Sequence, residues 1–212
     1  MLRIVPTKLR RLFPPDDPIA RAIAALCILR EDLLLELFGV IEERLGKLDE
    51  NDRGHRRTYF WRNTLRTLEE IRDLLNAVNS NAAFRETFAT LSPEAHEKFE
   101  LIKKELNKAS QAFLAVFRNQ IGGHLDTDFI QKGLEALDPG DESLMQLGDI
   151  LGKTRFRFTS DLVWTAILGM HPDRKDAAGK LDDILGASAR LTPVVSAIDD
   201  VFGWYVRTRR RL

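Results

Sequence analysis

Three residues of the stretch FRNQIGGHLD, residues 117–126, have side chains that could do chemistry together. Arg118 carries a guanidinium that can hold a phosphate through two parallel hydrogen bonds, and Asn119 supplies an amide that can orient a neighbouring group. His124 carries an imidazole that titrates near neutral pH and can therefore act as a general acid or base. The three side chains suit a site that binds a phosphate group and moves a proton.

Helical geometry alone would keep Arg118 and His124 apart. Six residues along a straight helix leave two side chains about 120° apart around the axis and about 9 Å apart along it. Gly122 and Gly123 change this expectation, because glycine tolerates the left-handed backbone in which helices end and lets the chain fold His124 back over the last turn. The glycines also leave room beside Arg118 and Asn119 for a phosphate group or a second helix.

The same stretch is also typical of an ordinary helix end. A double glycine commonly terminates a helix, and an arginine near a helix C-terminus is favoured by the helix dipole. His124, followed by Leu125 and Asp126, could simply begin the next turn. From the residues alone, the stretch can be interpreted either as a reaction site or as an ordinary helix end.

The remaining reactive side chains show no metal-ligand or nucleophile pattern. His55, His96 and His171 have no His, Cys or acidic neighbour at metal-ligand spacing, and His55 and His171 fall in predicted loops. Cys27 lies in an apolar helical run and is expected to be a small core residue. The sequence has no glycine-rich phosphate loop, no His-Glu-x-x-His and no nucleophile elbow. It therefore predicts no metal and no cofactor.

Three long helices are predicted in the first part of the chain. Asp17-Pro18 marks the start of a helix that runs to Leu45, followed by a loop, GKLDENDRG. A second helix begins near Arg56 and runs through Val78. A third opens at Ser92-Pro93-Glu94, with a cap, a proline and an acid in its first turn, and continues toward the double glycine.

Shorter elements are predicted after residue 126. Residues 127–141 indicate a short helix and a turn, residues 142–152 and 160–169 look helical, and residues 154–159 between them are either a brief extended piece or an irregular helix. A helix over about 178–190 precedes a last helix that is capped by Thr192-Pro193. The predicted fold is all-α: an up-and-down bundle of long antiparallel helices with additional C-terminal helices. Residues 1–17 form an N-terminal arm, residues 18–140 the core, and residues 141–212 helices that pack on or flank the core in one domain.

Composition fits an ordinary globular protein without a strong electric field. The 212 residues are 44% hydrophobic, and 32 basic residues balance 32 acidic ones. Local basic patches occur at both ends, where they indicate a solvated tail or a phosphate contact: Arg3, Lys8, Arg10 and Arg11, then Arg207, Arg209, Arg210 and Arg211. Charges interrupt the most apolar stretch, residues 19–41, so no membrane span and a cytoplasmic location are expected.

The spacing of Arg118, Asn119 and His124, late in a long helix of an all-α protein, resembles the signature of the HEPN superfamily. In that signature an arginine and a polar residue precede a histidine by four to six intervening positions, and here five residues lie between Arg118 and His124. RNQIGGHLD is especially similar to the branch associated with bacterial abortive infection and toxin systems. The resemblance covers these residues and, more loosely, the helical layout of the first 140.

The resemblance implies a homodimer whose two motifs meet in a groove that cleaves RNA without a metal. His124 would then perform acid–base chemistry on the ribose 2′-hydroxyl or on the leaving oxygen, Arg118 would stabilise the phosphate charge, and Asn119 would orient one of them. A toxin or phage-defence effector of this kind could also have an antitoxin or another regulatory protein as a partner. The alternative is a non-catalytic helical interaction module that binds a protein or nucleic acid.

A run of arginines and aromatic residues offers a second candidate surface. Tyr59, Phe60 and Trp61 are interleaved with arginines at positions 53, 56, 57, 62 and 66. Such a run could stack and neutralise RNA, or it could have one buried aromatic face and one solvated face.

Overall fold

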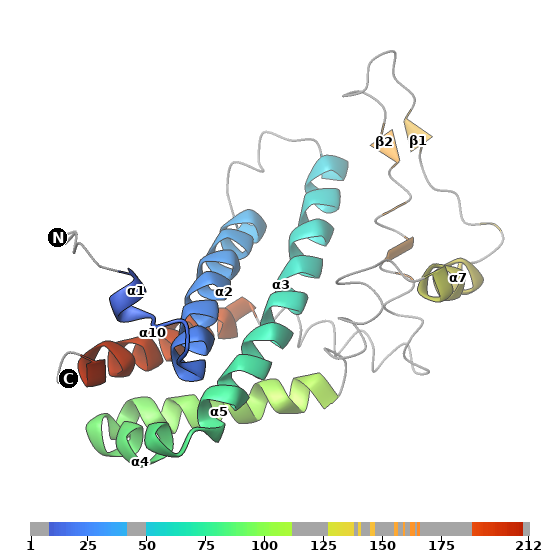
Figure 1. Cartoon of the computed structure of the whole chain (residues 1–212). Coiled ribbons are helices and arrows are strands. Elements are labelled where there is room, and N and C mark those ends of the chain that lie inside the picture. Colours follow the sequence, from blue (N-terminus) through green and yellow to red (C-terminus); the bar gives the residue numbers. More distant parts are fainter. Residues whose placement is uncertain are drawn as a thin grey trace. The chain divides into compact units, whose positions relative to one another are not determined.

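The computed structural model in Figure 1 describes residues 9–41, 50–111, 127–137, 140, 145–146, 155–156, 159, 162–163, 165 and 188–209. The chain divides into two compact units. Unit 1 comprises Met1–Leu34, Thr67–Phe113 and Leu191–Leu212, and unit 2 comprises Leu35–Arg66 and Leu114–Arg190. The predicted all-α class is confirmed, and the long helices α2 and α3 are packed antiparallel to each other.

The described elements are, in chain order, α1 (Leu9–Leu12), α2 (Pro18–Ile41), α3 (Glu50–Ser80), α4 (Ala82–Leu91), α5 (Pro93–Ala109), α7 (Thr127–Ala136), β1 (Met145–Gln146), β2 (Arg155–Phe156) and α10 (Ser188–Arg209). The two short strands pair antiparallel, with Met145 opposite Phe156 and Gln146 opposite Arg155. They form the only strand pairing among the described residues.

The start of α2 has the structure that its sequence predicts. Oδ1 of Asp17 accepts hydrogen bonds from the backbone N–H of Ile19 (2.9 Å) and of Ala20 (3.3 Å). These two amides belong to the first turn, where no helical carbonyl is available to them. Pro18 follows the cap, where its missing N–H costs nothing.

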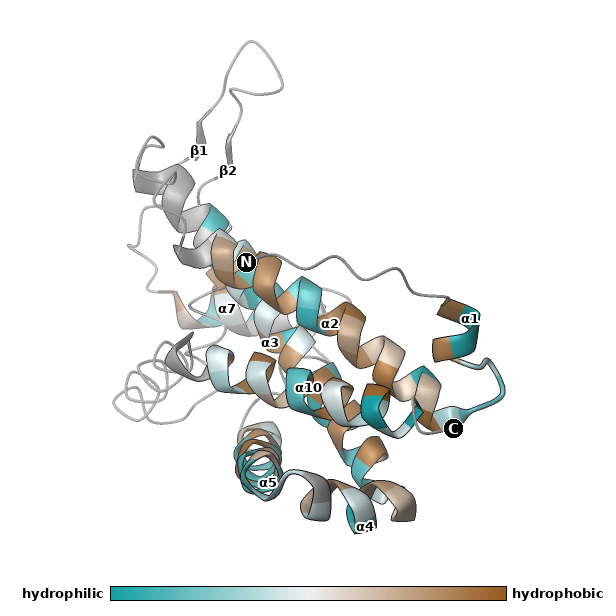
Figure 2. Ribbon diagram, turned by 90° about the vertical axis from the view of Figure 1, so that its left-hand side faces the viewer, coloured by the Kyte–Doolittle hydropathy of each residue, from teal (hydrophilic) through white to brown (hydrophobic). Residues whose placement is uncertain are grey.

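Unit 1 has a core in which five helices each bury one face. The fully or nearly fully buried residues include Ile23, Leu26 and Leu33 from α2, Ile71 and Leu75 from α3, Phe84 and Phe88 from α4, Phe99 and Ile102 from α5, and Ile198, Val201, Trp204 and Tyr205 from α10. Figure 2 shows apolar and polar segments alternating along α2, as expected for a helix with one buried and one solvated side.

Aromatic rings join α4, α5 and α10 in unit 1. The ring of Phe84 stacks on Phe88 at 4.7 Å and meets the edges of Phe99 at 5.2 Å and Trp204 at 4.9 Å, all between ring centroids. The indole N–H of Trp204 donates to Oγ1 of Thr87 at 3.0 Å. Such aromatic pairs add stabilisation beyond the apolar area that they bury.

In unit 2, α2 and α3 approach closely at a glycine. A Cβ atom placed on Gly39 would lie 2.6 Å from the ring of Phe60, well inside van der Waals contact. Trp61 and Leu65 are buried here, and Tyr59 meets the edge of the Phe60 ring. Glycine at position 39 therefore makes room for the aromatic side of α3.

Several predicted boundaries differ from the observed ones. Helix α3 begins at Glu50, so the second half of the predicted loop and His55 are helical. Helix α4 was not predicted, and the predicted helix over 142–152 is wrong at Met145–Gln146, which are extended. Residues 155–156 adopt the extended alternative, and residues 162, 163 and 165 are helical as predicted.

The last helix begins earlier than predicted. Helix α10 starts at Ser188, so Pro193 lies inside it and does not begin its first turn. The buried residues Leu191, Val194 and Val195 lie on either side of the proline. Packing of this apolar turn offsets the hydrogen bond that proline cannot make.

Candidate functional site

The residues of the predicted site, Arg118, Asn119 and His124, lie outside the described residues. Helix α5 is described through Ala109, and residues 110 and 111 continue it with the wider winding of a π-helix. The next described helix, α7, begins at Thr127. The assignment of these three residues to a site therefore stays a prediction.

A cluster of polar side chains links α3 to the last described turn of α5 in unit 1. The carboxylate of Glu69 is 1% exposed, and its Oε1 atom accepts a hydrogen bond from Oγ of Ser110 at 3.0 Å. The guanidinium of Arg72 forms an ion pair with the same Oε1 atom at 2.7 Å and also donates to Ser110. We call Glu69, Arg72 and Ser110 the buried triad.

The buried triad is incompletely satisfied. Oε2 of Glu69 and Nε of Arg72 are both buried and have no hydrogen-bond partner among the residues that the structure describes. A buried polar atom without a partner costs roughly 1–3 kcal/mol, and more when it is charged. The second carboxylate oxygen of Glu69 could therefore accept a hydrogen bond from a donor such as water.

A pair of amides lies about one helical turn from Arg72 and Ser110, on the same two helices. Asn76 and Asn107 exchange hydrogen bonds of 2.9 and 3.3 Å through their side chains. The backbone N–H of Ser110 donates to the carbonyls of both Asn107 and Leu106, and residues 110 and 111 are wound as a π-helix. Irregular turns of this kind are frequent near functional sites.

The sequence contains a signal for the buried triad that does not belong to any of the motifs described above. Glu69 lies four residues after Leu65 and one after Leu68, on a side of α3 that is otherwise apolar. A charged residue within an apolar stripe predicts a buried partner of opposite charge. Arg72, three residues later, is that partner.

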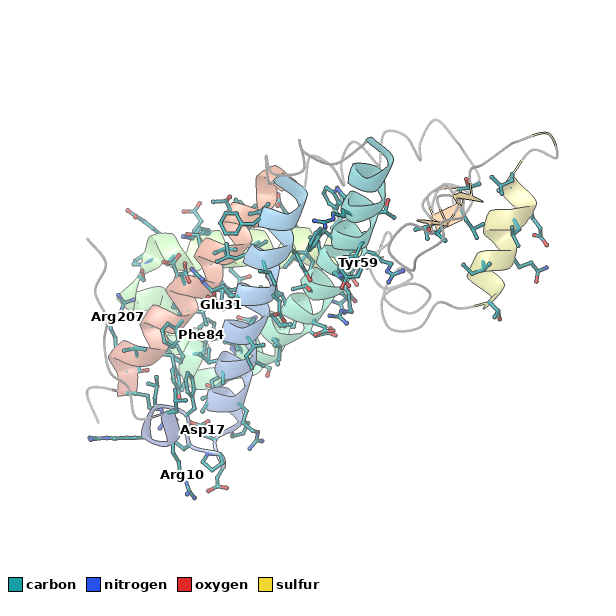
Figure 3. All side chains as sticks on the ribbon, turned by 90° about the horizontal axis from the view of Figure 1, so that it is seen from above. Arg10, Asp17, Glu31, Tyr59, Phe84 and Arg207 are labelled. Atoms are coloured by element: carbon teal, nitrogen blue, oxygen red, sulfur yellow. The ribbon has the colours of Figure 1, made fainter. Side chains whose placement is uncertain are left out.

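The run of arginines and aromatic residues on α3 is divided between a buried and an exposed side. Trp61 is 7% exposed and belongs to the core of unit 2, whereas Tyr59 is 53% exposed. Arg56 is exposed as well, and Figure 3 labels Tyr59 on α3. Tyr59 is thus the only ring of the three that is mostly open to solvent, so a stacking platform of several aromatic rings is not present.

The remaining reactive side chains in the described residues have structural surroundings. His96 is half-buried and meets the ring of Phe88 at 6.0 Å between centroids. Burial raises the pKa of the Cys27 thiol, although Arg30 acts in the opposite direction, so Cys27 is protonated at neutral pH and is a poor nucleophile. His171 lies outside the described residues.

The described part of the chain contains no group of three or more His, Cys, Asp or Glu side chains arranged to hold a metal ion. A shallow hollow of about 310 Å³ lies between α2 and α3 in unit 1, with Ala25, Ile28, Leu29 and Leu74 on its apolar sides. None of the described helices is long and apolar enough to cross a membrane.

Comparison of the chain with protein-family models, with curated proteins and with solved structures finds no match.

Proposed function

We propose that the chain is a HEPN-like, metal-independent endoribonuclease that acts as a homodimer and serves as a toxin or phage-defence effector. The observation that carries this proposal is the sequence Arg118-Asn119 followed by His124, at the spacing of the HEPN signature. The all-α fold with long antiparallel helices is compatible with it. The two copies of the motif would face a common groove, so that an arginine and a histidine need not converge within one chain.

The proposed reaction uses the substrate's own nucleophile. His124 removes the proton of a ribose 2′-hydroxyl, the 2′-oxygen attacks the adjacent phosphorus, and the bond from phosphorus to the 5′-oxygen breaks. The leaving oxygen takes up a proton, which a second imidazole or water supplies. Arg118 stabilises the additional negative charge on the phosphoryl oxygens, and Asn119 orients Arg118 or His124. The products are a 2′,3′-cyclic phosphate and a 5′-hydroxyl.

Replacement of His124 by alanine tests this proposal. Loss of a general acid–base catalyst typically slows a reaction by about 10²- to 10⁴-fold, so His124→Ala should reduce RNA cleavage by at least about 100-fold with an unchanged circular dichroism spectrum. Cleavage by the wild type should leave cyclic phosphate ends and persist in EDTA. His96→Ala is the matched control, because His96 lies on α5 against Phe88. Equal cleavage by His124→Ala and wild type would exclude the proposed site.

The second candidate function is a module that binds nucleic acid without cutting it. The exposed Arg10, Arg11 and Arg207 of unit 1 favour this alternative, because their guanidinium groups could hold a phosphate backbone without any contribution from His124. Binding of RNA by the wild type, without cleavage under any condition of pH or divalent ion, would support the binding module over the nuclease.

A further inference from the structure

The two basic segments at the ends of the sequence are held together in unit 1. The ring of Phe13, just after α1, stacks on Tyr205 of α10 with 5.7 Å between centroids and an interplanar angle of 7°. It also stacks on Phe202 at 6.4 Å. The hydroxyl of Tyr205 donates to the backbone carbonyl of Leu12 at 2.6 Å, across 193 positions of sequence.

An ion pair adds a second connection between the same segments. Arg209, in the last turn of α10, pairs with Asp17, the residue that caps α2. Its guanidinium also lies over the ring of Tyr205, 5.4 Å from the centroid. The aromatic stack joins the end of α1 to α10, and the ion pair joins α10 to the start of α2. Figures 1 and 3 show α1 near the C-terminal end of α10.

Three arginines at this end are exposed and have no partner among the described residues: Arg10 and Arg11 on α1, and Arg207 on α10. Arg30 and Arg72, elsewhere in unit 1, are by contrast paired with Asp199 and Glu69. We call Arg10, Arg11 and Arg207 the terminal basic surface. Figure 3 labels Arg10, Asp17 and Arg207 at this end of the unit.

The local charge at this end differs from that of the whole chain. The segments 10–21 and 207–209 contain five arginines, at positions 10, 11, 21, 207 and 209, and two aspartates, at positions 16 and 17, whereas the chain as a whole is neutral. The sequence adds Lys8 directly before α1, and Arg210 and Arg211 directly after α10. A positive region on a neutral protein attracts a polyanion locally and is sensitive to salt.

We propose that the terminal basic surface binds the phosphate backbone of RNA. It deepens the proposed function by adding a substrate-binding surface outside the catalytic motif, and it rests on that function for the choice of RNA as the polyanion. Guanidinium groups match phosphate oxygens with a bidentate fork, and three of them on two helices suit several phosphates along a strand. A membrane surface is disfavoured, because Leu9 is the only large apolar residue strongly exposed at this end among the described residues.

Substitution of all three arginines tests the surface in a chain that cannot cut. In the His124→Ala background, Arg10→Ala, Arg11→Ala and Arg207→Ala are combined, and binding of a fluorescent single-stranded RNA is measured between 50 and 300 mM salt, about the range over which phosphate contacts weaken strongly. We expect affinity to fall at least about tenfold at the lowest salt. The slope of log K against log salt should decrease by about 2, since each lost phosphate contact contributes about 0.7 for single strands.

The control removes the same charge from another part of unit 1. Arg85, Lys104 and Lys108 are exposed cations on α4 and α5, and their combined replacement by alanine should leave both affinity and salt slope near those of the parent. An equal loss in both triple variants would indicate a general charge effect and overturn the proposed surface. Loss of binding to phosphatidylserine vesicles with unchanged RNA binding would overturn it in favour of a membrane.

Comparing a dinucleotide with a long RNA as substrate tests RNA binding by the terminal basic surface separately from RNA cleavage at His124. In a chain with His124 intact, the Arg10, Arg11 and Arg207 substitutions should leave cleavage of a dinucleotide unchanged and raise KM for a long RNA. If wild type cleaves no RNA and the triple variant still loses RNA affinity, the nuclease proposal fails and the surface stands. If wild type cleaves RNA and the triple variant binds and cleaves long RNA normally, the surface fails and the nuclease stands.

Discussion

Glu69 illustrates how much a single buried charge depends on its partner. Glu69→Ala leaves the guanidinium of Arg72 with only Asp73 as an acid partner, and it leaves the hydroxyl of Ser110 without its acceptor. We expect this variant to lose roughly 1–3 kcal/mol of unfolding free energy in a urea titration, because the hydroxyl of Ser110 and part of the Arg72 guanidinium lose a hydrogen-bond partner away from bulk water. Replacing both Glu69 and Arg72 by methionine should recover most of the loss, because apolar residues of similar volume can substitute for a buried ion pair.

The double variant tests whether Glu69 and Arg72 stabilise the fold as an ion pair or contribute to the unfolding free energy independently. If Glu69→Met and Arg72→Met together destabilise the protein by the sum of the two single losses, the residues do not act as a pair. Melting of a conservative Ser110→Ala variant gives the contribution of the hydroxyl separately, which is expected to be about 1 kcal/mol.

At the level of single residues, the sequence identifies chemistry more readily than position. The types and spacing of Arg118, Asn119 and His124 suggested a site directly, whereas the buried triad joins residues from two helices. Glu69 and Arg72 are three positions apart and could be paired from the sequence, but Ser110 is 41 positions from Glu69. Only the packing of α3 against α5 brings that hydroxyl to the carboxylate.

At the scale of single helices, the N-cap of α4 can be tested through its contribution to the unfolding free energy. Oδ1 of Asn81 accepts a hydrogen bond from the backbone N–H of Phe84 at 3.0 Å, at the start of a helix that carries Phe84 and Phe88 into the core. Asn81→Ala should therefore lower the unfolding free energy by about 1 kcal/mol, and Asn81→Asp should retain most of it. Thr90→Ala, at an exposed position of the same helix, is the control for chemical denaturation. No difference between the alanine variants at 81 and 90 would contradict a capping role.

Helix starts were predictable where a local signal agreed with the packing. Asp17-Pro18 and Ser92-Pro93 both begin helices in the structure, because a proline in the first turn loses no hydrogen bond. Pro193, by contrast, does not begin a helix, because the apolar residues before and after it pack in the core and α10 is continuous from Ser188. Helix α4 escaped prediction because its ten residues follow α3 with only Asn81 between them.

Over the whole of unit 1, the contacts that join the two ends of the sequence could not be predicted from local sequence patterns. The basic residues at both ends were visible in the sequence, but their proximity depends on Phe13, Tyr205, Asp17 and Arg209. Aromatic and ionic contacts between segments so far apart in sequence have no periodicity that could predict them. A neutral chain can thus have a positive region that neither end of the sequence forms alone.

Tyr205 provides a test of that long-range contact through its pH dependence. Its ring is 1% exposed, and burial raises the pKa of its phenol above the usual range. At neutral pH, Tyr205→Phe should cost about 1 kcal/mol, since the carbonyl of Leu12 loses its donor. A pKa raised by folding means that the unfolded chain releases the proton first. The contribution of the phenol is therefore complete below about pH 10 and declines as the pH rises through the folded pKa. The difference in unfolding free energy between wild type and Tyr205→Phe, measured from pH 7 to 11, should shrink above pH 10. A constant difference over this range would mean that the phenol of Tyr205 is not a buried donor in the contact between α1 and α10.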